Sequence, residues 1–171
     1  TLDSSISQPD DEISCTVTAT DAFGGSDTAT ATIAVTNSKP TAVATASPAE
    51  AKVGDTLSCT GEAQDIDGDS PEISHLWQKD GLFLAAEGPL LLTEANTDVG
   101  EQIICVLSAT DKDGGEVLST SSSLVLNSDP VLSAEVSAPS AKAGESLSCI
   151  GTASDPDGGP TSLSYEWSTV E

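Results

Sequence analysis

The stretch Cys59-Thr-Gly-Glu-Ala-Gln-Asp65-Ile-Asp67-Gly-Asp69 decides the fold. Small or apolar residues alternate with polar ones from the cysteine onward, as in a β-strand that is buried on one face. The aspartates and the glycine then end the strand in an acidic loop. The same arrangement, with an aspartate six residues after a cysteine, begins also at Cys15, Cys105 and Cys149. The chain is therefore built from repeats of one strand-and-loop unit.

The repeats have a regular period. The features that show it, each pair 90 residues apart, are Cys15 and Cys105, Cys59 and Cys149, Trp77 and Trp167, and the two Asn-Ser-x-Pro segments that begin at Asn37 and Asn127. A period of this length is typical of whole domains in tandem. Proline ends a strand ladder, so we place the boundaries at the Asn-Ser-x-Pro segments. The predicted organisation is the C-terminal half of a repeat over 1–36, a complete repeat over 37–126 and the N-terminal half of a repeat over 127–171.

The complete repeat is predicted to be all β. Seven short segments have the composition and alternation of strands and are separated by Pro, Gly, Asp or Asn; they are 41–47, 56–63, 73–79, 82–85, 90–92, 102–110 and 116–126. No segment has a sustained helical period. Seven strands within one 90-residue repeat indicate a β-sandwich.

Charge and composition restrict the function. The 171 residues include 28 acidic and 5 basic side chains, for a formal charge of -23, which makes nucleic acid and anionic membrane surfaces poor partners. We expect no membrane insertion in this segment, because no apolar run is long enough to span a bilayer. Two Trp, one Tyr and two Phe residues give each repeat few large side chains to bury. Thin cores of this kind need additional cross-links.

Cys59, Trp77 and Cys105 together resemble the pattern of the immunoglobulin family, which has a cysteine in the second strand, a tryptophan in the third and a cysteine in the sixth. With its Asp-x-Asp-Gly loops, the chain is similar to the tandem immunoglobulin-like repeats, akin to cadherin and polycystic-kidney-disease repeats, of large bacterial cell-surface or extracellular proteins. The resemblance implies tandem immunoglobulin-like β-sandwich domains of about 90 residues. It is incomplete at Ile103, where the family has a tyrosine.

The resemblance implies an intradomain disulfide between Cys59 and Cys105, packed against a buried indole at Trp77 and, in the next repeat, at Trp167. Such a cross-link is worth about 4 kcal/mol in the chain-entropy model and implies an extracellular or cell-surface location. The alternative is a pair of buried free thiols. Cys15 and Cys149 would each pair with a missing half-repeat or with a neighbouring unit.

The family fold also implies that the second and sixth strands run in the same direction, so that the acidic loops after them meet at one pole. Carboxylates gathered there repel one another and favour a bound metal, and flexible sites made of oxygen atoms suit calcium. We therefore expect calcium near the Asn-Ser-x-Pro linkers, with ligands drawn from Asp21, Asp65, Asp67, Asp69, Asp111, Asp113, Asp155 and Asp157. Asp21 should bind least well, because Phe23 replaces the second aspartate of its loop. The alternative is that aspartate and glycine simply form turns.

Enzymatic chemistry has little support, since the chain has one histidine, His75, and no nucleophile elbow. We expect a structural or adhesive segment of an extracellular fibre or surface stalk. Its partners would be neighbouring immunoglobulin-like repeats or copies of itself, with a glycan or surface receptor for attachment. The alternative is a carbohydrate- or protein-binding accessory module of a secreted enzyme, which would expose an aromatic platform formed by Phe23, Phe83 or Tyr165.

The two half-repeats are complementary in sequence. One supplies the second half of a repeat with Cys15, and the other supplies the first half with Cys149. We hypothesise that the chain is one unit of a fibre, in which Cys149 of one unit bonds to Cys15 of the next. The alternative is that a longer tandem protein is divided at arbitrary points.

Overall fold

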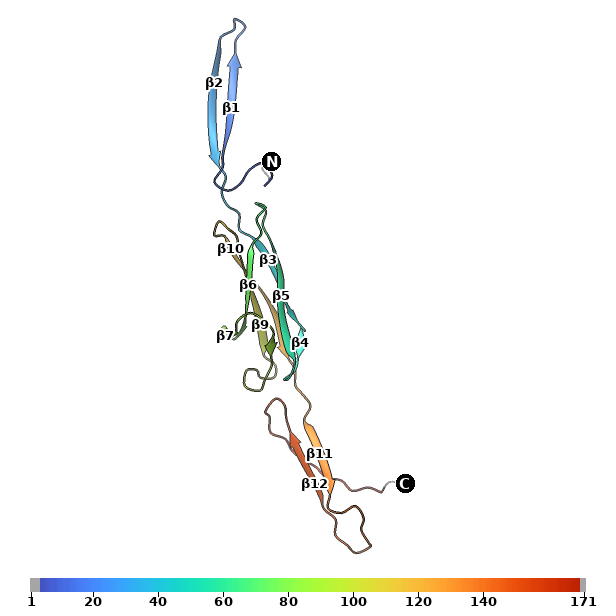
Figure 1. The fold of residues 1–171 in the computed structure, drawn as a ribbon. Helices are drawn as coiled ribbons and strands as arrows, with labels where there is room; N and C mark the ends of the chain where they lie inside the picture. The colour runs from blue at the N-terminus through green and yellow to red at the C-terminus, as the bar shows by residue number, and fades with distance from the viewer. Residues whose placement is uncertain (1–3, 170–171) are drawn as a thin grey trace. The chain divides into compact units, whose positions relative to one another are not determined.

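The computed structural model describes residues 4–169, and within them the chain is all β (Figure 1). The strands are β1 Glu12–Thr20, β2 Ser26–Ala34, β3 Thr41–Ser47, β4 Glu50–Ala51, β5 Thr56–Gln64, β6 Glu72–Lys79, β7 Leu82–Ala85, β8 Leu90–Leu91, β9 Gln102–Thr110, β10 Glu116–Val125, β11 Val131–Val136 and β12 Cys149–Ser154. All seven predicted segments form strands. Sequence alternation missed β4, a two-residue strand that forms by pairing in parallel with β10 through Glu50↔Leu124 and Ala51↔Val125.

Proximity of Cα atoms divides the chain into two compact units. Unit 1 consists of Thr1–Thr45, Cys59–Leu76 and Cys105–Ser121, and unit 2 consists of Ala46–Ser58, Trp77–Ile104 and Ser122–Glu171. The central strands form two sheets, in the orders β4-β10-β9-β6-β7 and β3-β5-β8. The division into a half, a complete and a half repeat stays a prediction.

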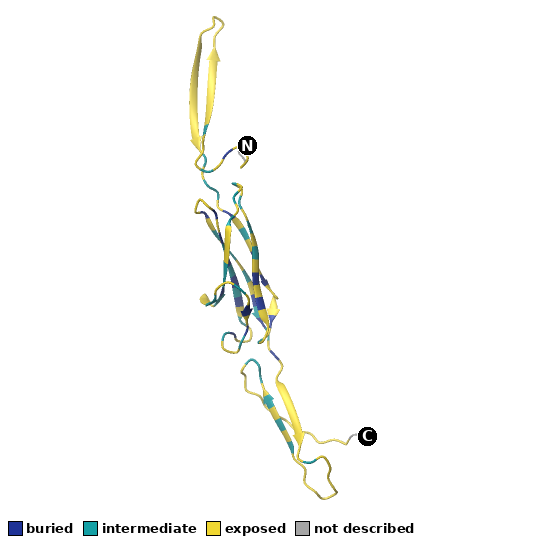
Figure 2. Ribbon diagram, viewed as in Figure 1, coloured by how far each residue is buried: buried dark blue, intermediate teal, exposed yellow. Residues whose placement is uncertain are grey.

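In unit 1, β1 and β2 form an isolated antiparallel hairpin, in register from Glu12↔Ala34 to Thr20↔Ser26. Figure 2 shows both strands exposed almost throughout. Apolar side chains lie in the open here, with Val17 62% and Ile33 66% exposed. An isolated two-stranded hairpin has no second layer to cover its apolar face.

The Cys59–Cys105 disulfide, which the resemblance implied, joins the two central sheets within unit 1. Its Cα atoms are 5.6 Å apart, and Cys59 lies on β5 while Cys105 lies on β9. Every second residue of β9 is buried, namely Ile103, Cys105, Leu107 and Ala109, each with no exposed surface. The period-2 alternation of the sequence thus places one face of β9 in the core.

Gly61 lies where two layers of unit 1 approach each other closely. A Cβ atom on this residue would clash with the Leu107 side chain and with the backbone carbonyl of Val43. Gly151, its counterpart 90 residues later, has no neighbour closer than 3.4 Å to such an atom. The same strand position therefore has no room for a Cβ atom in the central sheets, whereas β12 accommodates one with ordinary contacts.

Gly61→Ala should lower the free energy of unfolding by about 1–3 kcal/mol, because overpacking forces backbone or side-chain shifts. Gly151→Ala is the matched control and should leave it unchanged or slightly raised, since the added methyl group meets only ordinary contacts. Urea denaturation of both variants measures the difference. Equal effects of the two substitutions would contradict the close packing at Gly61.

In unit 2, Trp77 on β6 is fully buried, and its indole N–H donates a hydrogen bond of 3.0 Å to the carbonyl oxygen of Gly88. Leu57 on β5 pairs with Leu90 on β8 and is also fully buried. The sheet of β11 and β12 contains only these two strands. Trp167, predicted to be a core residue like Trp77, is 57% exposed because it lies outside any strand, in the chain that follows this two-stranded sheet.

Candidate functional site

The first aspartate of every acidic loop closes the turn of that loop. In each case one carboxylate oxygen accepts a hydrogen bond from the backbone N–H two residues further on, and in two loops also from the N–H four residues further on. Asp21 accepts from Phe23 and Gly25, Asp65 accepts from Asp67, Asp111 accepts from Asp113 and Gly115, and Asp155 accepts from Asp157. Aspartate favours such turns because its short side chain reaches its own backbone. Turn formation therefore accounts for one oxygen of each of these four residues.

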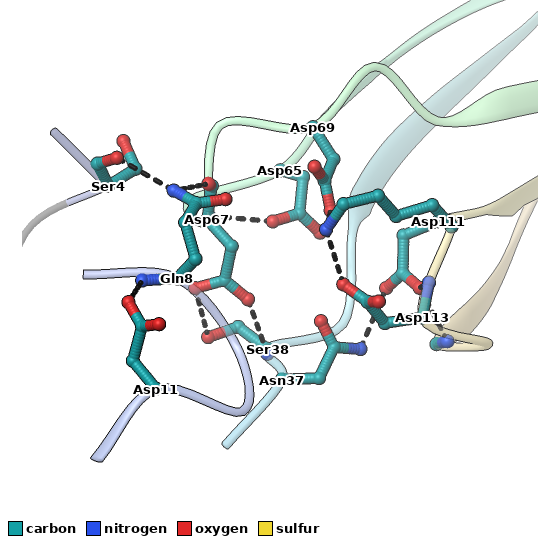
Figure 3. Close-up of polar contacts among 12 residues, drawn as sticks. Ser4, Gln8, Asp11, Asn37, Ser38, Asp65, Asp67, Asp69, Asp111 and Asp113 are labelled. Atoms are coloured by element: carbon teal, nitrogen blue, oxygen red, sulfur yellow. Dashed lines mark hydrogen bonds and ion pairs between the residues drawn. The ribbon is translucent and has the colours of Figure 1, made fainter. Parts of the chain in front are cut away.

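The second aspartate of the loop after β5 binds the segment that leads into β3 (Figure 3). Asp67 accepts the backbone N–H of Ser38 at 2.6 Å and the Ser38 hydroxyl at 3.2 Å. Asp157 makes the same pair of bonds to Ser128, at 2.5 Å and 2.9 Å. Both pairs use the same atoms and are 90 residues apart, so each Asn-Ser-x-Pro linker is fixed to an acidic loop in the same way.

Asp111, at the end of β9, holds the residue next to this serine. Its carboxyl is buried, and the side-chain amide of Asn37 donates to it at 3.0 Å. This bond is the main cause that lowers the pKa of Asp111 below its ordinary value; burial opposes it, and the backbone N–H groups of Gly115 and Asp113 support it. Because the folded-state pKa of Asp111 is lowered, its carboxylate stabilises the folded chain at pH values above the ordinary pKa of aspartate. This stabilisation is lost as the pH falls through the folded-state pKa.

Lys112 connects the two acidic loops. Its ammonium group lies 3.0 Å from an oxygen of Asp69 and 2.6 Å from one of Asp113. Asp113 and then Asp69 raise the pKa of Lys112, so the amine stays charged. The loops that follow β5 and β9 thus meet at one pole beside the linker, in the arrangement that the resemblance implied.

Two buried oxygen atoms at this pole have no hydrogen-bond partner, Oδ2 of Asp65 and Oδ1 of Asn37. A buried acceptor without a partner costs free energy. The described part of the chain contains no group of three or more His, Cys, Asp or Glu residues already placed to hold a metal ion. These two oxygens are therefore open to a further partner, whereas the predicted aspartate ligands form no metal-holding group among the described residues.

The structure separates the predicted metal ligands into three groups. Asp65, Asp67, Asp69, Asp111 and Asp113 lie together at the pole of the central sheets, Asp155 and Asp157 lie in the loop after β12, and Asp21 lies in the turn between β1 and β2. Sequence reasoning missed Asn37, Ser38 and Ser128 as direct partners of the loops. The signal was present, because these residues repeat at the same 90-residue spacing as the aspartates.

No protein-family model matches the sequence, and no curated protein is significantly similar to it. The residues that the structure describes include no helix long and apolar enough to cross a membrane. Fold and site together define an all-β protein with a disulfide between two sheets and with acidic loops bonded to the linkers.

Proposed function

We propose that the chain is a structural segment of an extracellular stalk or fibre, built from tandem immunoglobulin-like sandwiches whose linkers are held by acidic loops, disulfides and calcium. The observation that carries this proposal is the identical bonding of Ser38 to Asp67 and of Ser128 to Asp157. A linker fixed by two hydrogen bonds at each repeat bends less than a free one, which is the property a stalk requires. An oxidising location follows from the disulfide.

The immunoglobulin-like part of the proposal has support in the strand pattern. Strands β1 and β2 begin 90 residues before β9 and β10, and β11 begins 90 residues after β3. The disulfide between sheets and the buried Trp77 are the two core features expected of such a sandwich. Each partial repeat would accordingly be part of a sandwich of the same type.

The calcium part of the proposal has support in the two unpartnered oxygens. Asp65 and Asn37 would supply these oxygens, and Asp111 would supply a carboxylate that already contacts Asn37. Lys112 pairs with one oxygen each of Asp69 and Asp113, which leaves these two carboxylates less available for a metal. Calcium would supply the positive charge that the remaining carboxylates lack and would draw the linker and both loops together.

Asp67→Ala should free the linker. The Ser38 N–H loses its acceptor, so its amide hydrogen exchange should accelerate towards the rate of an exposed amide, while the exchange of β9 amides stays slow. Asp69→Ala, in the same loop but bonded to Lys112, is the matched control and should leave Ser38 protected. Fast exchange of Ser38 in the unmodified chain would sink the proposal of a stiff linker.

Calcium should raise the melting temperature of the chain, and chelator should reverse the change. With calcium at about a hundredfold excess over Kd, the expected stabilisation is ~2.7 kcal/mol. Asp65→Asn should abolish this response, because it removes the negative charge of the carboxylate whose Oδ2 has no hydrogen-bond partner. Asp21→Asn is the control, since Asp21 closes a similar turn but lies in the isolated hairpin, and it should retain the response. Thermal melts that do not respond to calcium would remove the metal from the proposal.

The alternative of a binding module rests on exposed aromatic side chains. Phe23 is 98% exposed, Phe83 65% and Tyr165 54%. They lie in the turn between β1 and β2, on β7, and in the chain after β12. The linker bonds recur at the 90-residue spacing, whereas these aromatic side chains do not, so the stalk is the better-supported function.

A further inference from the structure

The tip of the acidic loop after β5 contacts the segment that precedes β1 (Figure 3). The side-chain amide of Gln8 donates a hydrogen bond of 3.2 Å to the backbone carbonyl oxygen of Asp67 and one of 2.7 Å to that of Ser4. A Cβ atom on Gly68 would lie 3.1 Å from the Cβ atom of Ser4. All four residues belong to unit 1. The loop tip therefore meets the segment 4–8 directly, in addition to holding the linker.

The same contact recurs 90 residues later, within unit 2. Gly158 corresponds to Gly68 and Glu94 corresponds to Ser4, and a Cβ atom on Gly158 would lie 2.5 Å from Oε1 of Glu94. Gly114, in the loop after β9, has a φ of 87°, close to the 88° of Gly68, but a Cβ atom on it would meet nothing within 4 Å. The contact is therefore specific to the loop that follows β5 or β12 and is not a general property of these loop glycines.

The segments that meet the two loop tips are folded alike. Three pairs of hydrogen bonds, 90 residues apart, hold 4–11 and its counterpart 94–101. They run from the N–H of Gln8 to Asp11 Oδ2 and from that of Asp98 to Glu101 Oε2, both at 2.8 Å; from the N–H groups of Asp10 and Gly100 to the carbonyl oxygens of Val35 and Val125, at 3.0 and 2.8 Å; and from the N–H groups of Val35 and Val125 to the carbonyl oxygens of Asp11 and Glu101, at 2.8 and 2.9 Å. The surface that meets the loop tip is therefore a built feature that recurs with the period of the chain.

We propose that the tip of this acidic loop is a docking site for the preceding repeat of the same chain. At the first junction the segment 4–8 docks on 66–68, and at the second junction 94–98 docks on 156–158. The inference deepens the proposed function, on which it rests for the tandem arrangement, by naming the surface through which consecutive repeats touch. Glycine is needed at Gly68 and Gly158 because a side chain there would occupy the space that the partner fills.

The first junction is the stronger of the two. The residue at the second junction that corresponds to Gln8 is Asp98, whose carboxylate cannot donate a hydrogen bond to the loop and instead pairs with Lys79 at 3.2 Å. Glu94 also brings a negative charge to the tip of a loop that already carries two aspartates. Like charges at this distance repel one another, so the second junction lacks the amide bond and carries a repulsion that the first does not.

The test places one cysteine on each side of the first junction, Ser4→Cys with Gly68→Cys, in the full chain with Cys15→Ser and Cys149→Ser. The two Cβ atoms, 3.1 Å apart, need only a small shift to reach the disulfide separation of about 3.5–4.5 Å. The matched control pairs Ser4→Cys with Gly114→Cys, where φ is nearly the same. In glutathione disulfide the junction pair should close at least about tenfold faster, as mass spectrometry of alkylated thiols measures it. Equal rates for the two pairs would overturn the proposal.

A second pair of variants tests the amide bond of the first junction. Gln8→Glu, added to the junction pair, removes the donor to the Asp67 carbonyl oxygen and should slow closure about tenfold. Gln64→Glu makes the same change at an exposed residue and should leave the rate unchanged. Equal effects of the two would also overturn the proposal. Slow closure together with a protected Ser38 amide would remove the docking site and leave the stiff linker of the proposed function intact.

Discussion

Replacing Cys59 by Ala and Cys105 by Val should lower the free energy of unfolding by about 4 kcal/mol. The bond closes a loop with a sequence separation of 46 residues, and its removal restores the conformational freedom of that loop in the unfolded chain. Single domains have a total stability of about 5–15 kcal/mol, so this loss is a large fraction of it and should move the unfolding midpoint to a clearly lower urea concentration. Urea denaturation followed by circular dichroism measures the change.

Cys15→Ser combined with Cys149→Ser is the control for this result. It removes two cysteines that form no bond in the structure, and the unfolding curve should not move. Reduction of the unmodified chain provides a second comparison, because it breaks the cross-link and keeps the side-chain volume. A double Cys59/Cys105 variant as stable as the unmodified chain would show that the sheets need no cross-link.

Trp77→Ala should lower the free energy of unfolding by about 3–5 kcal/mol. The indole is fully buried, so its loss leaves a cavity, and the carbonyl oxygen of Gly88 loses the N–H that reaches it at 3.0 Å. Trp77→Phe should cost less, because the ring remains and only the hydrogen bond and part of the volume are lost. Urea unfolding followed by far-ultraviolet circular dichroism gives both values.

Trp167→Ala is the matched control for Trp77, since the two residues are 90 apart in the same repeat position. Trp167 is 57% exposed, and its removal should change the stability of the isolated chain by less than about 0.5 kcal/mol. If both substitutions had the same effect, burial would not explain the role of Trp77.

The sequence predicted the strands well because their signal is local. Alternation along β9 and β5 identifies the buried face without knowledge of the partner strand, and glycine or aspartate ends each run. Strand β4 has only two residues and no alternation to detect. It exists because Leu124 and Val125 lie beside it, and that pairing is a property of the folded chain.

The candidate site was predicted in part. The spacing of aspartates to cysteines located both loops, and the fold resemblance brought them to one pole. The hydrogen bonds from Asn37 to Asp111 and from Ser38 to Asp67 join residues 74 and 29 positions apart, and such pairs depend on the exact path of the linker. The pairing of Lys112 with Asp69 likewise depends on tertiary structure, since the two residues are 43 positions apart.

The disulfide also determines how the chain responds to tension. When a force pulls on the two ends of a cross-linked repeat, the segment between Cys59 and Cys105 carries no load, since the S–S bond bypasses it. Its separation of 46 residues corresponds to roughly 160 Å of extended chain that stays withheld even after the sheets come apart. Oxidised repeats would therefore reach their full length early and stop lengthening, whereas reduced repeats would continue to extend.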